Sequence, residues 1–156
     1  MKARVLLVVV VLVVVMASIG SMVAARNAVV PFRATYKTYP TQVSEQGDVP
    51  MIFEIPAEGK ATHLGKSTWY ADMWVDPRPY PWTQGGVMTF TAANGDQLFG
   101  TYDGFAKPGG PGIEFWGVFE ISEGTGRFEG ATATGDYRGE CGVGEGILHF
   151  DGMLTK

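Results

Sequence analysis

The sequence predicts an all-β protein, a small antiparallel β-barrel of about eight strands preceded by a signal peptide. Short runs of alternating apolar and polar residues recur from residue 32 onward, separated by turns rich in Gly and Pro. After residue 25 no apolar period of 3.6 residues persists over about three helical turns. Between Gly100 and Gly152 there are 15 glycines, many inside strand-like runs. Such glycines mark bulges and strong coiling, which a small barrel needs in order to close.

Residues 1–25 have the pattern of a signal peptide. Lys2 and Arg4 precede an unbroken apolar run at residues 5–16, and small residues lead up to Ala25, after which we expect cleavage. The alternative is an uncleaved N-terminal anchor, because residues 5–25 carry no charge over close to the ~20 residues that a membrane-spanning helix needs. Both interpretations predict a domain outside the cytoplasm, either secreted or in the periplasm or cell envelope.

The charge of the remaining chain excludes some partners. Without residues 1–25, 131 of the 156 residues remain, enough for one domain, with 10 basic against 16 acidic residues and hence a net charge of −6. An acidic surface repels phosphate backbones and anionic lipids, so we expect no nucleic-acid partner, and a membrane partner only if residues 1–25 are retained. Cys141 is the only cysteine, so no internal disulfide can form.

The N-terminal third is predicted to contain an arm and two strands. We expect residues 26–50 to be an extended arm with one strand, and residues 51–156 to form the barrel domain. A first barrel strand at residues 51–55 is expected to end at Pro56, because proline cannot donate to a ladder. Residues 59–75 are then predicted to be one long strand, followed by a loop at residues 76–84 that contains three prolines.

The clearest local signal is a hairpin at residues 87–105. Asn94 and Gly95 stand between two β-rich runs and suit a type I′ turn, which needs positive φ at both central residues. Closure by a two-residue turn would place Phe90 opposite Phe99. A second turn is expected at residues 107–112, which read Lys-Pro-Gly-Gly-Pro-Gly.

Two later runs alternate strictly and are predicted to be strands. The first alternates over residues 113–121, and the second over residues 146–154. The pattern does not determine which face points inward. In the first run one face carries the odd residues Ile113, Phe115, Gly117, Phe119 and Ile121. The other face carries the even residues Glu114, Trp116, Val118 and Glu120.

The run Gly-Thr-Gly-Arg-Phe-Glu-Gly-Ala-Thr-Ala-Thr-Gly at residues 124–135 resembles a signature of the allene oxide cyclase and dirigent superfamily. Further matching features lie at residues 59–65, 89–96 and 150–152, so the resemblance spans about residues 57–154. It is strongest to the exported bacterial members, most of which have no assigned chemistry.

The resemblance implies an eight-stranded barrel with a central cavity, often assembled into homodimers or homotrimers. In the plant members the cavity cyclises an unstable fatty-acid epoxide or steers the coupling of phenoxy radicals. No position of this chain matches an active-site motif of either, so no catalytic residue carries over. The run at residues 124–135 is expected to be a tight turn, with Phe128 closing the barrel end and Arg127 at its rim.

An aromatic cluster is the best candidate for a ligand site. Aromatic rings at the end of a barrel line pockets for apolar ligands, although they equally cap a core or form a subunit contact. Glu114 and Glu120 share a face with Trp116, where a carboxylate beside an indole could act as general acid or base, or lie at the surface for solubility. The candidate ligand-binding residues are Trp69, Tyr70, Trp74, Tyr80, Trp82, Trp116, Glu114 and Glu120.

Other reactive side chains carry little chemistry in this sequence. Cys141 with His63 or His149 could form a nucleophile and base, but its acidic neighbours disfavour a thiolate. His149 and Asp151 project from one strand face, yet a closed zinc site needs four ligands and the chain has two histidines. We therefore expect no cofactor and no metal.

Two hypotheses of function follow. The first is an exported barrel without enzymatic activity that binds a small apolar or aromatic ligand or assembles with itself. The second is a cofactor-free isomerase or cyclase that steers a reactive apolar substrate. An acidic residue in the cavity beside the aromatic rings would favour the enzyme, and an apolar interior would favour the binding protein.

Overall fold

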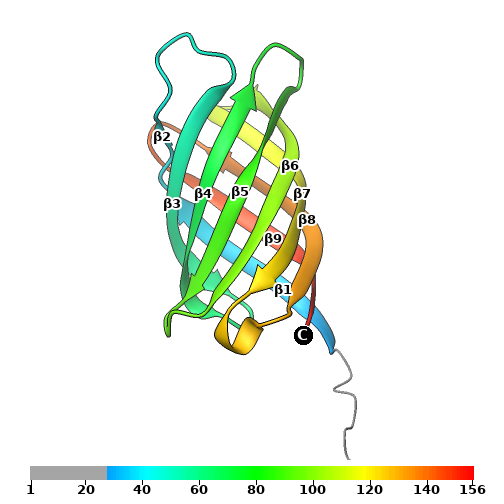
Figure 1. Cartoon of the computed structure of the whole chain (residues 1–156). Helices are drawn as coiled ribbons and strands as arrows, with labels where there is room; N and C mark the ends of the chain where they lie inside the picture. Colours follow the sequence, from blue (N-terminus) through cyan, green and yellow to red (C-terminus); the bar gives the residue numbers. More distant parts are fainter. Residues whose placement is uncertain (1–27) are drawn as a thin grey trace, which may run out of the picture.

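The chain folds into a closed antiparallel barrel of eight strands, which confirms the predicted fold class (Figure 1). The structure is a computed structural model that describes residues 28–156, so the expected signal peptide lies outside the described residues. Each strand pairs with its neighbours in the order β1-β9-β8-β7-β6-β5-β4-β3, and β3 pairs with β1 to close the barrel. The elements are β1 (Val29–Thr38), β2 (Thr41–Gln42), β3 (Met51–Ala61), β4 (Gly65–Asp76), β5 (Trp82–Ala92), β6 (Gln97–Gly109), β7 (Gly112–Gly124), η1 (Gly126–Phe128), β8 (Thr132–Cys141) and β9 (Gly146–Thr155).

β1 belongs to the barrel wall and is not part of a separate arm. It pairs along its whole length with β9, and its second half pairs with β3 from Ala34↔Ala61 to Thr38↔Ala57. The short β2 continues beside β3 at Thr41↔Glu54. The barrel therefore begins at Val29 and not at residue 51, because β1 supplies the hydrogen bonds that join the first and last parts of the sheet.

β3 runs through Pro56, so the strand does not end where the sequence predicted. The Pro56 carbonyl accepts a hydrogen bond from the Tyr39 amide at 3.0 Å, where β3 changes partner from β1 to β2. Because the N and C=O of one strand residue face the same neighbour, the ring nitrogen of Pro56 also faces this junction. On its other side Pro56 stays in register with Tyr70 of β4. A proline is tolerated there because it interrupts no continuous ladder.

The single long strand predicted at residues 59–75 is instead a hairpin between β3 and β4. Ala61 pairs with Gly65, and the three residues between them turn the chain, with positive φ at His63 (67°) and at Gly65 (70°). The Thr62 amide donates to the Arg33 carbonyl at 2.8 Å, which holds the turn against β1. A loop of three residues leaves the odd and even alternation unbroken from one strand to the next, so the pattern could not reveal it.

The hairpin between β5 and β6 exists as predicted, but its register differs by one residue. Phe90 lies opposite Leu98, and Thr89 opposite Phe99. The Gly95 amide donates to the Ala92 carbonyl at 2.9 Å, and Gly95 has a φ of 90° whereas Asn94 is not among the residues with positive φ. This is the three-residue loop with glycine in the left-handed position, and not the type I′ turn. The shift directs Phe90 and Leu98 inward together.

Two loops at the end of the barrel opposite to the β5–β6 hairpin are shorter than predicted. β6 continues to Gly109, with Lys107 opposite Glu114, so the turn to β7 consists only of residues 110–111. The connection between β4 and β5 covers residues 77–81, since Asp76 already pairs with Thr83. These loops lie at the top of the barrel in Figure 1, together with residues 43–50 and 142–145, and this end is called the upper end below.

The barrel interior is packed with aromatic rings around Phe150. Its ring centroid lies 5.2 Å from both Phe90 and Phe119, 5.9 Å from Trp69, and 6.4 Å from Tyr36. These residues are at most 3% exposed. Each belongs to a different strand, so the cluster connects five of the eight strands across the barrel interior.

Glycines on the inner wall make room for these rings. A Cβ on Gly135 or Gly152 would lie 2.8 or 2.9 Å from the ring of Phe119, and one on Gly117 would lie 2.8 Å from the ring of Tyr137. A methyl group at these places would overlap a ring or the neighbouring backbone. Gly117, Gly135 and Gly152 are therefore packing partners of aromatic side chains.

The lower end of the barrel is closed by the connection between β7 and β8 at residues 125–131. η1 places Phe128 in the core with no exposed surface, in the same buried cluster as Leu98 and Ile121, while Arg127 remains half exposed beside Asp96. The predicted roles of Phe128 and Arg127 are thus confirmed. Figure 1 shows η1 lying across this end of the barrel.

Gly95→Ala should destabilise the fold by about 1–2 kcal/mol, the cost of placing a side chain in the left-handed region. No heavy atom lies within 4 Å of the added Cβ, so this cost comes from the backbone alone. Gly95→Asn should cost less, because Asn tolerates this conformation. Urea unfolding gives the free energy of unfolding of the wild type and of both variants. Equal losses of stability in Gly95→Ala and Gly95→Asn would contradict the assigned turn.

Gly117→Ala should destabilise the fold by about 1–3 kcal/mol, because its Cβ would lie 2.6 Å from the Gly104 Cα and closer still to the Asp103 carbonyl oxygen. The matched control is Gly142→Ala, whose Cβ has no neighbour nearer than 4.0 Å. The control should change the free energy of unfolding by less than about 0.5 kcal/mol. A tolerated Gly117→Ala would show that Gly117 is not packed closely against the Gly104 backbone and the Tyr137 ring.

Candidate functional site

The upper half of the barrel interior holds a cavity of about 280 Å³. It begins above the aromatic cluster, where Trp69, Tyr102, Tyr137 and Phe150 form its floor, and it reaches the upper end. Its wall and rim consist of Thr38, Pro40, Met51, Phe53, Ile55, Met73, Val75, Trp82, Gln84, Ala106, Ile113, Phe115, Cys141, Gly142, Gly144 and Leu148.

The wall is apolar because the alternation of each strand directs its apolar face inward. The odd residues of β4 and β7, such as Met73 and Phe115, face the interior, and so do the even residues of β6 and β9, such as Ala106 and Leu148. Ala106 is a small inner residue beside this space, whereas Phe32, Phe90 and Phe128 fill the lower half. The cavity is therefore bounded by the inward apolar faces of the strands at the upper end.

Gln84 and Tyr137 satisfy each other within the cavity. The Gln84 Nε2 donates to the Tyr137 hydroxyl at 3.1 Å and to the Phe105 carbonyl at 3.3 Å. Gln84 is only 4% exposed, so these bonds offset the cost of burying its amide. Because the Gln84 amide already donates to two protein partners, it needs no hydrogen bond from a ligand.

Trp69 and Tyr102 are different, because their polar atoms have no protein partner. The Trp69 Nε1 and the Tyr102 hydroxyl are both buried and accept or donate no hydrogen bond within the described residues. Trp69 is 3% and Tyr102 5% exposed, and their ring centroids lie 6.2 Å apart. Both residues line the cavity, which makes them the unsatisfied polar groups at its floor.

The cavity offers no charged group. Among the described residues, its lining includes no Asp, Glu, Lys, Arg or His. Desolvation raises the pKa of Tyr102 and of Tyr137 far above the usual range, so both phenols stay protonated. Burial also raises the pKa of the Cys141 thiol, which leaves it protonated at neutral pH.

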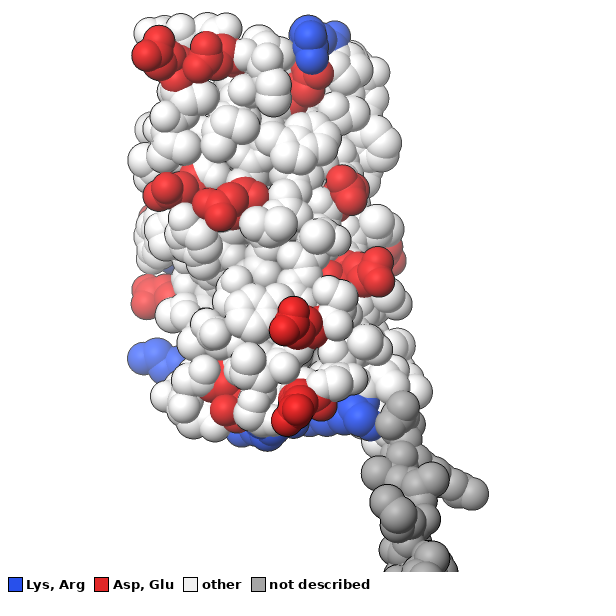
Figure 2. Space-filling model, in the orientation of Figure 1, with Lys and Arg blue, Asp and Glu red and all other residues white. Residues whose placement is uncertain are grey.

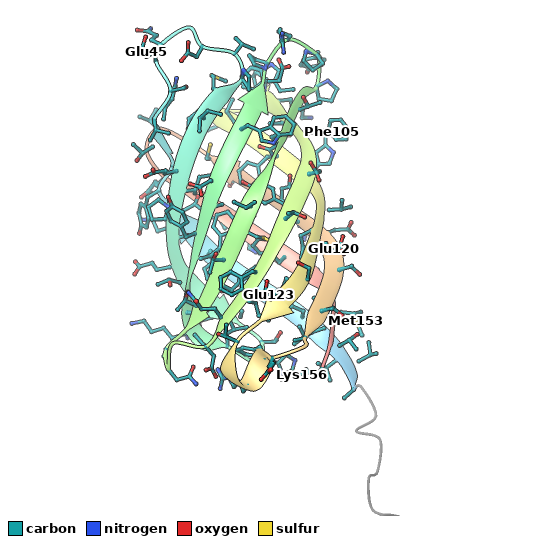
Figure 3. All side chains as sticks on the ribbon, viewed as in Figure 1. Glu45, Phe105, Glu120, Glu123, Met153 and Lys156 are labelled. Atoms are coloured by element: carbon teal, nitrogen blue, oxygen red, sulfur yellow. The ribbon has the colours of Figure 1, made fainter. Side chains whose placement is uncertain are left out.

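The structure places two of the eight candidate residues in the cavity and six outside it. Trp69 lies at the floor and Trp82 at the wall. Glu120, for example, is exposed halfway along the outer surface (Figure 3). The reason is the period of two within each strand, which separates Trp69 from Tyr70 and Ile113 from Glu114. The residues outside the cavity are Tyr70, Trp74, Tyr80, Glu114, Trp116 and Glu120.

Gln84, Tyr102 and Tyr137 were not among the sequence candidates. Tyr102 stands in an alternating run with Leu98 and Gly100. Because residues two positions apart in a strand share a face, the sequence could have assigned Tyr102 to the same face as Leu98. The pairing of Gln84 with Tyr137 joins residues 53 positions apart, and no local pattern signals it.

The other reactive side chains are not brought together. His149 lies on the outer surface with its Nδ1 3.0 Å from the Thr35 Oγ1, and His63 lies at the lower end with its Nε2 3.1 Å from the Pro31 carbonyl. Cys141 lines the cavity at the upper end, and Asp151 lies 3.6 Å from Arg33. Within residues 28–156, no group of three or more His, Cys, Asp and Glu side chains is arranged to hold a metal ion.

Comparisons of the chain with protein-family models, curated proteins and solved structures found no match. In the part of the chain that the structure describes, no helix is long and apolar enough to span a membrane.

Three of the six tyrosines should resist alkaline titration in the folded protein. Burial raises the pKa of Tyr36 to about 12, and those of Tyr102 and Tyr137 also rise, whereas an exposed tyrosine titrates near 10. The unfolded chain therefore releases these protons first. Their contribution to stability is complete below about pH 10 and is lost as pH rises above it, by up to ~1.4 kcal/mol per pH unit for each tyrosine.

Ultraviolet absorbance of the native protein and of protein in urea measures this difference directly. Unfolding curves at increasing alkaline pH give the loss of stability. If Tyr36, Tyr102 and Tyr137 lost their protons near pH 10 in the folded protein, these three phenols would not be buried.

Proposed function

We propose that the chain is an exported small barrel that binds a small apolar or aromatic ligand in the cavity of its upper half. The observation that carries this proposal is the apolar cavity of about 280 Å³ above a tightly packed aromatic floor. Ligand sites are typically concave and apolar, with a few placed polar groups, and their volumes begin near ~300 Å³. The cavity is near this lower limit, which suits a ligand of one or two rings.

Export is the second part of the proposal. It rests on the basic, apolar and small-residue pattern of residues 1–25, which predicts a signal peptide or an anchor. Secreted, periplasmic or envelope location each fits this pattern.

A cofactor-free isomerase or cyclase of the allene oxide cyclase and dirigent type is the alternative. The resemblance at residues 124–135 supports it, and such chemistry can depend on positioning alone. The cavity lining, however, includes no acidic residue among the residues described. This favours the binding protein, by the criterion that the sequence itself suggested.

Self-assembly into a homodimer or homotrimer is compatible with ligand binding. Trp74, Phe105, Trp116 and Val118 are all at least 36% exposed and form an outer aromatic patch on β4, β6 and β7. The rings of Phe105 and Trp116 lie 6.2 Å apart, and Val118 is in register with Asp103 beside them. Aromatic residues are enriched in subunit contacts. The face in Figure 2 carries scattered acidic residues with uncharged surface between them.

Native mass spectrometry of the purified protein tests the proposal. It reports signal cleavage, subunit number and any retained ligand mass in one spectrum. A retained mass supports a binding barrel and identifies the class of ligand, whereas a bare monomer after gentle extraction would speak against both binding and assembly.

Ala106→Phe should abolish ligand retention while the protein stays folded, because Ala106 is 2% exposed and lines the cavity. A phenylalanine there would occupy the space that a ligand needs. The control Val118→Phe adds similar bulk on the outer wall, where Val118 is 58% exposed, and should leave retention unchanged. Equal retention by both variants would place the ligand outside the cavity.

A further inference from the structure

We propose, on the basis of the ligand binding proposed above, that the ligand is an uncharged and mostly hydrocarbon molecule with one oxygen acceptor. Its oxygen is held at the floor of the cavity by the Trp69 Nε1–H and the Tyr102 hydroxyl, and its apolar part fills the upper half of the barrel. The ligand therefore enters with its polar end first.

The first step of the argument is that the floor contains two polar atoms that the protein itself does not satisfy. The Trp69 Nε1 and the Tyr102 hydroxyl are buried without a hydrogen-bond partner, although neighbouring Gln84 and Tyr137 are paired. Buried polar groups in folded proteins are nearly always paired, and an unpaired one is costly. Two such groups on neighbouring rings that line one cavity are an arrangement that a ligand atom would satisfy.

The second step concerns which kind of atom fits. An indole N–H can only donate, and a phenol can donate as well, so both groups can serve one acceptor. A carbonyl or hydroxyl oxygen has two lone pairs and can accept both hydrogen bonds. Trp69 and Tyr102 have centroids 6.2 Å apart, so one end of a ligand can face both rings.

The third step excludes charge. Of the residues that the structure describes, none that lines the cavity is a Lys, Arg or His that could pair with a carboxylate, and none is an Asp or Glu that could pair with an amine. Moving an unpaired ion into such a site costs several kcal/mol. A neutral oxygen avoids this cost and still satisfies the two donors.

The remaining wall determines the rest of the ligand. Above the floor the lining is mainly hydrocarbon, and Met51 and Met73 add flexible thioethers that adapt to irregular shapes. At the packing density of protein interiors, ~0.74, the cavity accommodates about 200 Å³ of van der Waals volume. A two-ring compound is of suitable size.

The test uses three probes with the same ring system: 2-ethylnaphthalene, 2-acetylnaphthalene and 2-naphthoate. The first two differ chiefly by the carbonyl oxygen, and the third carries a charge. Dissociation constants are measured by equilibrium dialysis against the protein expressed from the full-length chain. The quantity of interest is the ratio of the constants for ketone and hydrocarbon, because this ratio cancels the general hydrophobic contribution within each protein.

Tyr102→Phe and Trp69→Phe should each shift this ratio against the ketone by about fivefold, the effect of one lost hydrogen bond. The matched control is Trp82→Phe, which changes a tryptophan that also lines the cavity but is only partly buried, and it should leave the ratio unchanged. Binding of 2-naphthoate to the wild type should be at least about tenfold weaker than binding of the ketone.

Tyr102→Phe has a second readout in the free protein. Because the hydroxyl has no protein partner, its removal should leave the unfolding midpoint unchanged or raise it. A clear loss of stability would mean that the hydroxyl is already satisfied, which would overturn the inference.

The failures are distinguishable. An unchanged ratio in both floor variants, or tight binding of 2-naphthoate, overturns the inference about the oxygen and the charge but leaves ligand binding intact. If no probe binds and native mass spectra show no retained mass in wild type or in Ala106→Phe, the proposed function itself is wrong and the inference falls with it.

Discussion

The packing of aromatic rings around Phe150 is the interaction on which the rest of the structure depends. This one side chain contacts five other rings from different strands, with centroid distances between 5.2 and 6.4 Å. A closed barrel has a fixed interior width, so large rings fit only where the facing wall is small. Gly135 and Gly152 provide this space for Phe119, as Gly117 does for Tyr137. The aromatic rings therefore pack in the interior only because the facing residues are glycines.

This packing also divides the interior into two halves. Below Phe150, side chains such as Phe128 and Leu98 fill the barrel to its lower end. Above it, smaller inner residues such as Ala106 leave a cavity whose floor is the upper side of the same cluster. The cluster therefore both stabilises the fold and presents Trp69 and Tyr102 to the cavity. The two properties are linked, because Trp69 packs against Phe150 in the cluster while its Nε1 has no partner among the described residues.

The aromatic residues fall into two groups that differ in their surroundings and not in their type. Trp69 and Tyr102 are buried at the cavity floor, whereas Trp74 and Trp116 lie on the outer wall with about a third of their surface exposed. Adjacent residues of one strand, such as Trp69 and Tyr70, point to opposite sides of the barrel. The inner group suits a small ligand, and the outer aromatic patch suits a contact with another protein chain.

The sequence by itself determined the fold class, the existence of the hairpin at Asn94 and Gly95, and the closing role of Phe128, because alternation and turn chemistry are local properties. Only the tertiary structure decided the register that pairs Phe90 with Leu98, the passage of β3 through Pro56, and the turn at His63 that alternation conceals. It also decided which face of each strand points inward, and so moved Glu114, Trp116 and Glu120 to the outer surface. The cavity joins Trp69, Gln84, Tyr102 and Tyr137 from four strands. Their meeting depends on how the sheet closes, and no local pattern carries that information.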